Sequence, residues 1–293
     1  MQKHPDVGNW IDFWKATKNF PAKKSVRDQA QAWNERWNRL PDGMPSRKMA
    51  MGRRKRMARI FEMLDVASFS LQGSRILDIA SGPGAVSIPF AHAGATVTAL
   101  DISGKALERL HAEAEQHSLS IKTLECSWHA ANIDKLGLRN GFDLVFAANT
   151  PALKEPRDFE RMIACSNNIC YYEHTLHSGG HLRMKHPAPL LKILNGAQAQ
   201  RIGSEMSWFL YGFMYLYLSG YRPLLKIDSH KRRAKLGWEE AASRIIQWRE
   251  HTRSGTASLK RKLREYFQGT AVDGMCGINS EGYSGRMVWK VKL

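Results

Sequence analysis

The middle of the chain alternates short apolar runs with stretches that carry an apolar residue every three or four positions. Two apolar residues lead into Asp78, and a turn of small residues follows at 80–84. A second apolar run, 97–100, ends in Asp101. Continuous apolar runs are typical of buried parallel strands, and glycine lets a turn approach a ligand closely. Residues 75–103 are therefore predicted to form the mononucleotide-binding half of a doubly wound α/β fold.

The same alternation continues to the end of the chain, where turn residues separate further apolar runs from helical patterns. The further strands are expected at residues 121–128, 142–148, 168–174, 224–228 and 287–291. The helices after the second strand are expected at residues 105–118, 156–166, 189–200, 205–219, 238–253 and 258–267. The pattern predicts seven strands, with a helical insertion at 183–222 after the fifth strand.

The first turn distinguishes two families that share this order of elements. The dinucleotide fingerprint G-x-G-x-x-G/A is incomplete, because Ser87 stands at its last position counted from Gly82. In the other register Ala80 replaces the first glycine. The segment D-I-A-S-G-P-G at 78–84 instead resembles the first motif of class I S-adenosylmethionine-dependent methyltransferases. The run that ends in Asp101 resembles the second motif of that family.

The resemblance covers residues 71–180 and implies a Rossmann-like sheet that is mostly parallel, with residues 287–291 as one antiparallel strand. It implies that Asp101 binds the ribose hydroxyls, that Ser127 and Trp128 flank the adenine, and that Asn149 lies next to the methyl group. The residues that the resemblance assigns to S-adenosylmethionine are Asp78, Ala80, Ser81, Gly82, Gly84, Asp101, Ile102, Ser127, Trp128 and Asn149.

The N-terminal part of the chain, 1–66, is expected to form a helical cap or lid on a methyltransferase domain at 67–293. Tryptophans recur in its two shorter helical patterns, and a long basic helix leads into the first strand. The segment around Trp33 and Trp37 resembles a helix that closes over the cofactor in many small-molecule methyltransferases. Two interpretations stay open for it: a lid over the cofactor, with Trp33 and Trp37 as candidate substrate-binding residues, or a hydrophobic contact with the core.

Candidate groups for acceptor chemistry follow the third and fifth strands. Methyl transfer from a sulfonium needs alignment, and a base only where the nucleophile carries a proton. His129, Asn149 and His174 are the catalytic candidates, although the more common role of a histidine in such a loop is a structural hydrogen bond. Tyr211 and Tyr215 are candidates for an aromatic substrate pocket or for helix packing. No metal is predicted, because the histidine pair at 174 and 177 lacks a carboxylate partner.

The chain is also strongly basic. The 293 residues carry a formal net charge of +17 and include four cysteines without a C-x-x-C pair. The cysteine pattern and the polar N-terminus lead us to expect a cytoplasmic protein. The apolar stretch 206–221 is too short for a membrane span. Basic runs occur at 47–59, 231–235 and 260–264, either as solvated helix faces or as a surface for a large anion.

The sequence therefore predicts a methyltransferase that uses S-adenosylmethionine and acts on a small molecule. Three alternatives remain. The basic charge favours an RNA acceptor, although the basic runs contain almost no aromatic residues. A nicotinamide-dependent oxidoreductase would share the strand order, and a sensor or scaffold would bind the cofactor without using it. The acceptor atom and the oligomeric state are not predicted.

Overall fold

The computed structural model describes residues 4–17, 25–39, 47–177, 189–190, 193, 207–252 and 257–292. Its helices are α1 (Val7–Thr17), α2 (Val26–Asn38), α3 (Arg47–Val66), α4 (Ser87–His92), α5 (Gly104–Gln116), the 3-10 helix η1 (Trp128–Ala130), α6 (Pro156–Cys165), α8 (Trp208–Leu218), α9 (Trp238–Thr252) and α10 (Ala257–Thr270). Its strands are β1 (Arg75–Ile79), β2 (Thr96–Asp101), β3 (Ile121–Glu125), β4 (Phe142–Ala148), β5 (Ser166–His177), β6 (Leu224–Gly237) and β7 (Met275–Lys290).

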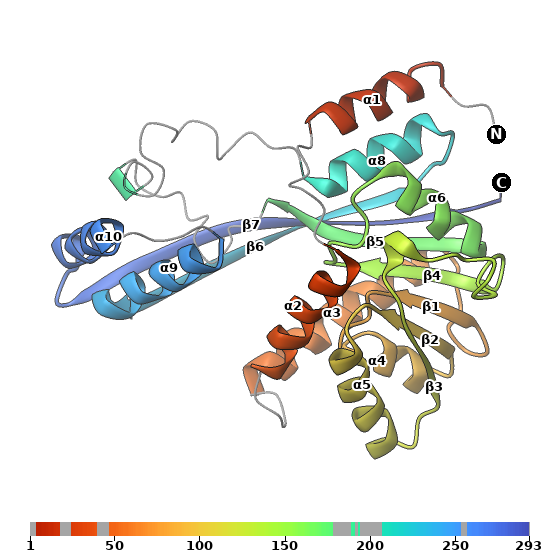
Figure 1. Ribbon diagram of the computed structural model, residues 1–293, viewed down its shortest axis with the longest axis horizontal. Coiled ribbons are helices and arrows are strands. Elements are labelled where there is room, and N and C mark those ends of the chain that lie inside the picture. Colours follow the sequence, from red (N-terminus) through yellow and green to blue (C-terminus); the bar gives the residue numbers. More distant parts are fainter. Residues whose placement is uncertain are drawn as a thin grey trace. The chain divides into compact units, whose positions relative to one another are not determined.

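The strands form one seven-stranded sheet in the order β3-β2-β1-β4-β5-β7-β6 (Figure 1). The β1 strand pairs in parallel with β2 on one side and with β4 on the other. The β2–β3 and β4–β5 pairs are also parallel, and β7 is the one strand that runs antiparallel. The order of the strands reverses at β1: β2 and β3 follow on one side of it, and β4 and β5 on the other. The prediction of a doubly wound, mostly parallel sheet is confirmed.

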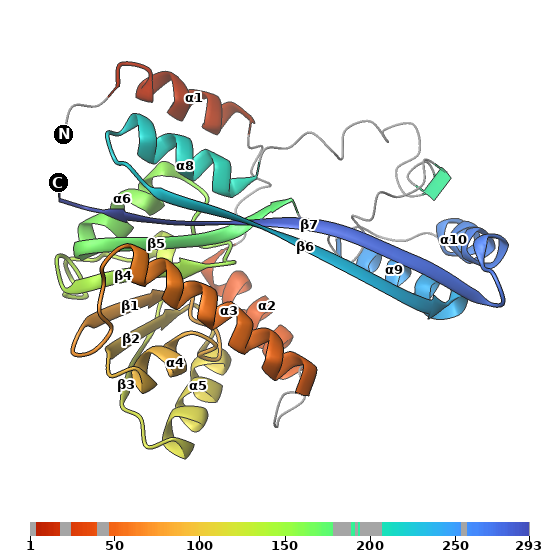
Figure 2. The ribbon, with the colours of Figure 1, turned by 180° about the vertical axis from the view of Figure 1, so that it is seen from behind.

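Helices α3 and α4 cover one face of this sheet, and α3 lies in front of the strands in Figure 2. The α3 helix packs there because its apolar residues recur at helical spacing, while the opposite side of the helix is basic. Alternate residues of β1, β2 and β4 point into the same cluster. Its most deeply buried members include Ile60, Leu64, Ile76, Phe90, Leu144 and Phe146.

The opposite face carries α6, with α8 and α1 stacked beyond it in both ribbon views. Phe159 of α6 packs edge-on against Tyr172 of β5 at a centroid distance of 5.2 Å. Trp14 of α1 contacts both Phe159 and Tyr211 of α8, at 6.0 and 5.4 Å. The apolar side of α1 therefore belongs to the core, and Trp14 is 1 % exposed.

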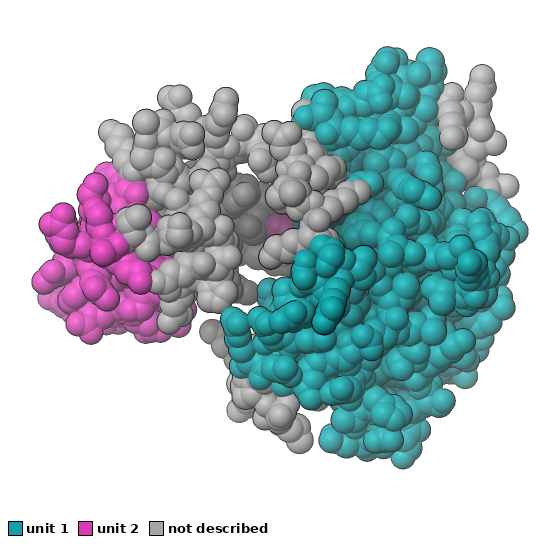
Figure 3. Space-filling view, in the orientation of Figure 1, with its two compact units in different colours: residues 1–174, 211–226, 286–293 teal, residues 175–210, 227–285 magenta. Residues whose placement is uncertain are grey.

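The chain divides into two compact units, coloured separately in Figure 3. Unit 1 comprises residues 1–174, 211–226 and 286–293, and therefore includes β1 to β4, most of β5 and the three N-terminal helices. Unit 2 comprises residues 175–210 and 227–285. Within unit 2, α9 and α10 pack on each other through a small apolar cluster that includes Ile245, Leu263 and Phe267.

Several elements differ from the sequence prediction. The sixth and seventh strands were expected to be short, but β6 and β7 reach into unit 2 with 14 and 16 residues. Residues 229–235 of β6 are polar, so no apolar run signals a strand there, and the basic run at 231–235 is not a helix face. Most of the predicted helix at 189–200 lies outside the described residues. No helix in the described part of the chain has the length and hydropathy of a membrane span.

Candidate functional site

A cleft of about 550 Å³ opens at the carboxyl ends of β1, β2, β3 and β4, within unit 1. Parallel strands direct their following loops to the same edge of the sheet, which is where α/β folds bind ligands. Helices α2 and α3 add residues to the rim. The predicted site residues that line the cleft are Trp33, Trp37, Ala80, Ser81, Gly82, Asp101, Ile102, Ser127, Trp128, His129 and Asn149.

The turn after β1 contains residues with positive φ angles, a conformation that glycine adopts more easily than other residues. Ala80 and Gly82 both have φ of 56°, and Gly84 has φ of 84°. The Ser81 N–H donates to the carbonyl of Leu100 at 3.1 Å, which ties the turn to β2. Because Gly82 has no side chain, its backbone is available at the cleft surface.

Asp101, the last residue of β2, is held by two backbone groups. Its Oδ2 accepts from the Gly82 N–H and its Oδ1 from the Ser103 N–H, both at 2.8 Å. The side chain is 7 % exposed, and this burial raises the pKa of the carboxyl, while the two N–H groups act in the opposite direction. Each carboxylate oxygen keeps a second lone pair for a hydroxyl group in the cleft.

Helix α2 forms one wall of the cleft and docks through a few polar and aromatic contacts. The Asn34 side-chain oxygen accepts from the Ser103 hydroxyl at 2.6 Å and from the Lys105 N–H at 3.2 Å. Trp37 lies so close to the turn that a Cβ at Gly82 would be 3.3 Å from its ring. No residue of α2 is buried, so the helix lies on the surface of unit 1.

The loop after β3 is fixed to helix α6. Trp128 is 2 % exposed and its indole N–H donates to the Asp158 carbonyl at 3.3 Å. The His129 Nδ1 lies 3.0 Å from Oδ1 of Asp158. Asp158 is buried and also accepts from the Arg161 guanidinium at 3.3 Å. A histidine at the cleft is thus oriented by a buried carboxylate.

Asn149 follows β4 in a left-handed conformation with φ of 50°. Its N–H donates to the Glu173 carbonyl at 2.7 Å, and its side-chain amide donates to the Glu173 carboxylate at 2.8 Å. The same carboxylate oxygen accepts from Nε of Arg56 at 3.1 Å. Glu173 uses one N–H of the Asn149 amide, which leaves the second N–H and Oδ1 for a ligand.

Five predicted residues lie elsewhere. Asp78 is buried behind the turn, and Gly84 packs so tightly that a Cβ would be 3.0 Å from Leu110. The ring of His174 stacks on Tyr172 in β5. Tyr211 and Tyr215 pack among α1 and α6 and do not line the cleft.

Sequence reasoning missed several residues that line the cleft or hold its walls. Arg56 lies inside a basic run that was interpreted only as a surface, and no motif marks Glu173. The further lining residues are Gln29, Ala32, Pro83, Ala85, Leu100, Cys126, Ala148, Thr150, Pro151, Ala152 and Lys154. Among the described residues no group of three or more His, Cys, Asp or Glu side chains is arranged to hold a metal.

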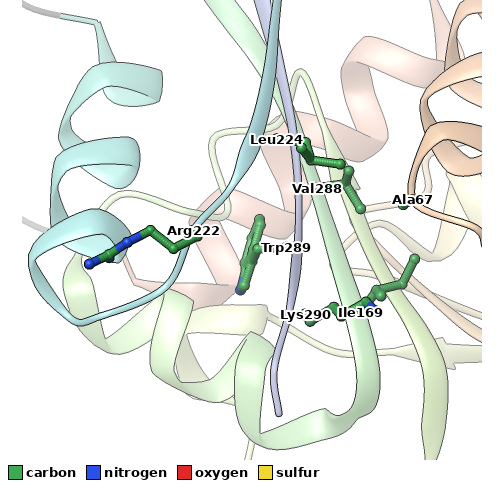
Figure 4. A pocket seen from close by; sticks show the side chains of 7 residues that line it. All are labelled: Ala67, Ile169, Arg222, Leu224, Val288, Trp289 and Lys290. Carbon is green, nitrogen blue, oxygen red and sulfur yellow. The ribbon is translucent and has the colours of Figure 1, made fainter. Parts of the chain in front are cut away.

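A second cavity of about 160 Å³ lies in unit 1 around β7 (Figure 4). Figure 4 shows the Trp289 indole beside Val288 and Leu224, with the Arg222 guanidinium directed away from them. It is lined by Ala67, Ile169, Arg222, Leu224, Val288, Trp289 and Lys290. None of the predicted site residues is among them, so we assign the functional site to the larger cleft.

Comparison with known families agrees with this geometry. Residues 76–170 match the family model described as a methyltransferase domain. Over these residues the chain is similar to methyltransferase domains. The matched region runs from β1 into β5 and contains the glycine turn, Asp101 and Asn149.

Two sequence relatives of this chain are uncharacterized proteins of Mycobacterium tuberculosis. One is 43% identical over 77 residues, which is 26% of this chain and 26% of the relative. The other is 36% identical over 74 residues, 25% of this chain and 27% of the relative. The match thus spans about a quarter of the length of these relatives.

Among solved structures, the magnesium protoporphyrin IX methyltransferase of Synechocystis with bound S-adenosylhomocysteine aligns with a TM-score of 0.50. The alignment covers 89% of this chain and 98% of that protein, at 13% sequence identity. At this identity the likeness concerns the fold of the methyltransferase domain and its flanking elements alone.

Proposed function

We propose that this chain is an S-adenosylmethionine-dependent methyltransferase whose acceptor is a small molecule. The observation that carries the proposal is the cleft itself, where the glycine turn, Asp101 and Asn149 share one surface inside a methyltransferase domain. Its volume lies within the usual range for small-ligand sites.

The cleft residues fit the parts of this cofactor. Asp101 can accept both ribose hydroxyls, because its oxygens keep lone pairs beside the Gly82 and Ser103 bonds. Ile102 offers an apolar surface for one face of the adenine, and Ser127 with Trp128 borders the other side. Gly82 lines the cleft, so the turn that it forms is where we place the methionine portion.

The bound cofactor would supply a methyl group activated by the positive charge of its sulfur. The chain then has to hold the acceptor in line and exclude water. Asn149 lines the cleft, and because its amide nitrogen donates to Glu173, we assign the contact with the acceptor to its amide oxygen. It can accept a hydrogen bond from an O–H or N–H nucleophile.

His129 is the proposed base for an acceptor whose nucleophile carries a proton. The buried Asp158 carboxylate accepts from Nδ1, which leaves the lone pair on Nε2. This is the arrangement of a base oriented by a third group. A proton released by the acceptor would go to Nε2 of His129.

A small acceptor is favoured because α2 narrows the cleft. Trp33 and Trp37 line it, and Trp37 lies against the glycine turn. The structural neighbour from Synechocystis is named for a small-molecule acceptor, magnesium protoporphyrin IX, which supports this preference. An RNA acceptor remains the second candidate, because the formal net charge is +17.

The function is tested by a screen of methyl acceptors with S-adenosylhomocysteine formation as the readout. Small hydroxyl, amine and thiol compounds form one arm, and total RNA forms the other. We expect turnover with members of the first arm. Turnover with RNA alone would replace the small-molecule proposal. Binding of S-adenosylmethionine without turnover in either arm would favour a sensor or scaffold.

A further inference from the structure

Arg56 on α3 lines the cleft, and an ion pair holds its side chain in place. Arg56 donates through Nε to the Glu173 carboxylate at 3.1 Å, and the side chains of Arg56 and Glu173 are 28% and 7% exposed. Glu173 also accepts from the Asn149 amide at 2.8 Å and from the Tyr171 hydroxyl at 3.5 Å. Glu173 on β5 is thus held by the loop after β4 and by a neighbouring residue of its own strand, and in turn fixes the direction of the Arg56 guanidinium.

The fixed guanidinium still has hydrogen-bonding capacity. Only its Nε is used by Glu173, and the described residues include no partner for its two terminal nitrogens. These groups form the planar fork that suits a carboxylate or a phosphate. Because Asn149 shares one oxygen of Glu173 with Arg56, the fork adjoins the end of β4.

A second cation lies on the loop that follows Asn149. Lys154 lines the cleft, and its backbone N–H donates to Asp158 at 3.0 Å, which fixes the loop. Its ammonium has no partner among the described residues. Residues 149–152 line the cleft between Asn149 and Lys154 along the chain, so both cations border the loop that the acceptor would approach.

The ion pair with Glu173 offsets the charge of Arg56, but it occupies only the Nε of the guanidinium. Asp101 is the one carboxylate among the residues that line the cleft, and its oxygens are already bonded to the Gly82 and Ser103 N–H groups. The cations therefore offer hydrogen-bond donors to a ligand, through the terminal nitrogens of Arg56 and the ammonium of Lys154. Donors on cationic groups form strong, charge-assisted hydrogen bonds with an anion.

We propose that the methyl acceptor carries a carboxylate or phosphate group and that Arg56 and Lys154 bind this group. This inference rests on the proposed function, since it names the class of substrate for the same cleft. Glu173 acts as a positioning residue, because it orients both the Arg56 fork and the Asn149 amide. The same anion chemistry has one other source, the carboxylate of the cofactor, and the experiment separates the two.

The test uses the full chain saturated with S-adenosylhomocysteine and isothermal titration with three probes: benzoate, phenyl phosphate and the neutral benzamide. We expect at least one of the acids to bind about 10-fold more tightly than benzamide, as charge-assisted bonds allow. Arg56→Gln and Lys154→Gln should each remove most of this preference. Arg53→Gln is the matched control, since it removes the same charge from an exposed position of α3.

A second titration shows whether Arg56 and Lys154 bind the acid group of the acceptor or the carboxylate of the cofactor. The same variants are titrated with S-adenosylhomocysteine and with 5′-methylthioadenosine, which lacks the carboxylate. We expect Arg56→Gln and Lys154→Gln to change both affinities by less than about 2-fold. If Arg56→Gln weakens only S-adenosylhomocysteine, Arg56 serves the cofactor and the proposal is overturned. It is also overturned if neither acid binds more tightly than benzamide.

Separate controls distinguish a loss of folding from a loss of binding. Arg56→Gln leaves the Glu173 carboxylate with one partner fewer, so the thermal unfolding of this variant is measured beside each titration. The side chain of Lys154 makes no hydrogen bond or ion pair with the described residues, so Lys154→Gln keeps the test valid if Arg56→Gln unfolds. Failure of the wild-type chain to bind S-adenosylhomocysteine would contradict the proposed function, whereas loss of the acid preference alone contradicts this inference.

Discussion

The hydroxyl of Ser87 donates a 2.6 Å hydrogen bond to the carboxylate of Asp78. Asp78 is 3 % exposed at the centre of the sheet, and Ser87 is the first residue of α4. Burial raises the pKa of Asp78 to about 7, while the Ser87 bond and the charge of Arg56 act in the opposite direction. Ser87, which replaces the last residue of the dinucleotide fingerprint, thus bonds directly to Asp78, the acid of the motif at 78–84.

This raised pKa makes stability depend on pH. The ordinary pKa of the carboxyl is 3.8, so between that value and about 7 the folded state binds a proton that the unfolded state has lost. The free energy of unfolding therefore decreases as pH rises through this window. Urea unfolding should show wild type losing roughly 2–3 kcal/mol between pH 5 and pH 8 relative to Asp78→Asn. Equal pH dependence in the two proteins would show that Asp78 is not protonated in the fold.

The docking of α2 gives a second prediction. Asn34→Ala removes the acceptor for both the Ser103 hydroxyl and the Lys105 N–H. Since α2 has no buried residue, we expect little change in the melting temperature but about a 3- to 10-fold loss of S-adenosylhomocysteine affinity. Hydrogen exchange should accelerate in α2.

The control for that experiment is Gln31→Ala on the same helix, because Gln31 is exposed and bonds only to Glu35 within α2. If both variants bind the cofactor equally well, Asn34 does not hold a ligand-binding wall.

The third prediction concerns the orientation of His129. In Asp158→Asn the amide nitrogen can face Nδ1, which places the ring proton on Nε2 and removes the base. With an acceptor from the screen, kcat should fall roughly 100-fold while the affinity for S-adenosylmethionine is retained. Asp134→Asn, at a surface carboxylate that pairs with Arg139, serves as the control. An unchanged kcat in Asp158→Asn would exclude His129 as the base.

The sheet and the position of the cleft were predictable because local patterns encode them. Apolar runs that end in Asp78 and Asp101 mark β1 and β2, and a parallel sheet brings their carboxyl ends to one edge. The glycine turn could be identified for the same reason, since its positive φ angles restrict the residue types at Gly82 and Gly84.

The partners of these residues were not predictable from local patterns. Arg56 and Glu173 are 117 positions apart, and the strand around Glu173 shows only that the residue follows two adjacent tyrosines. The roles of Tyr211 and Tyr215 depended on whether α1 or a ligand would cover them, and the spacing of residues along α8 fits both. Residues 229–235 of β6 carry no apolar run, and they belong to unit 2, not to the core of unit 1.

The most direct measurement for the account as a whole is calorimetric titration of the chain with S-adenosylmethionine and with NAD, repeated on Asp101→Asn. We predict saturable binding of S-adenosylmethionine to the wild type and no binding of NAD. Asp101→Asn should bind S-adenosylmethionine about 10-fold more weakly, because one acceptor for the ribose hydroxyls is lost. Binding of NAD without S-adenosylmethionine, or undiminished affinity in Asp101→Asn, would contradict the assignment of this cleft.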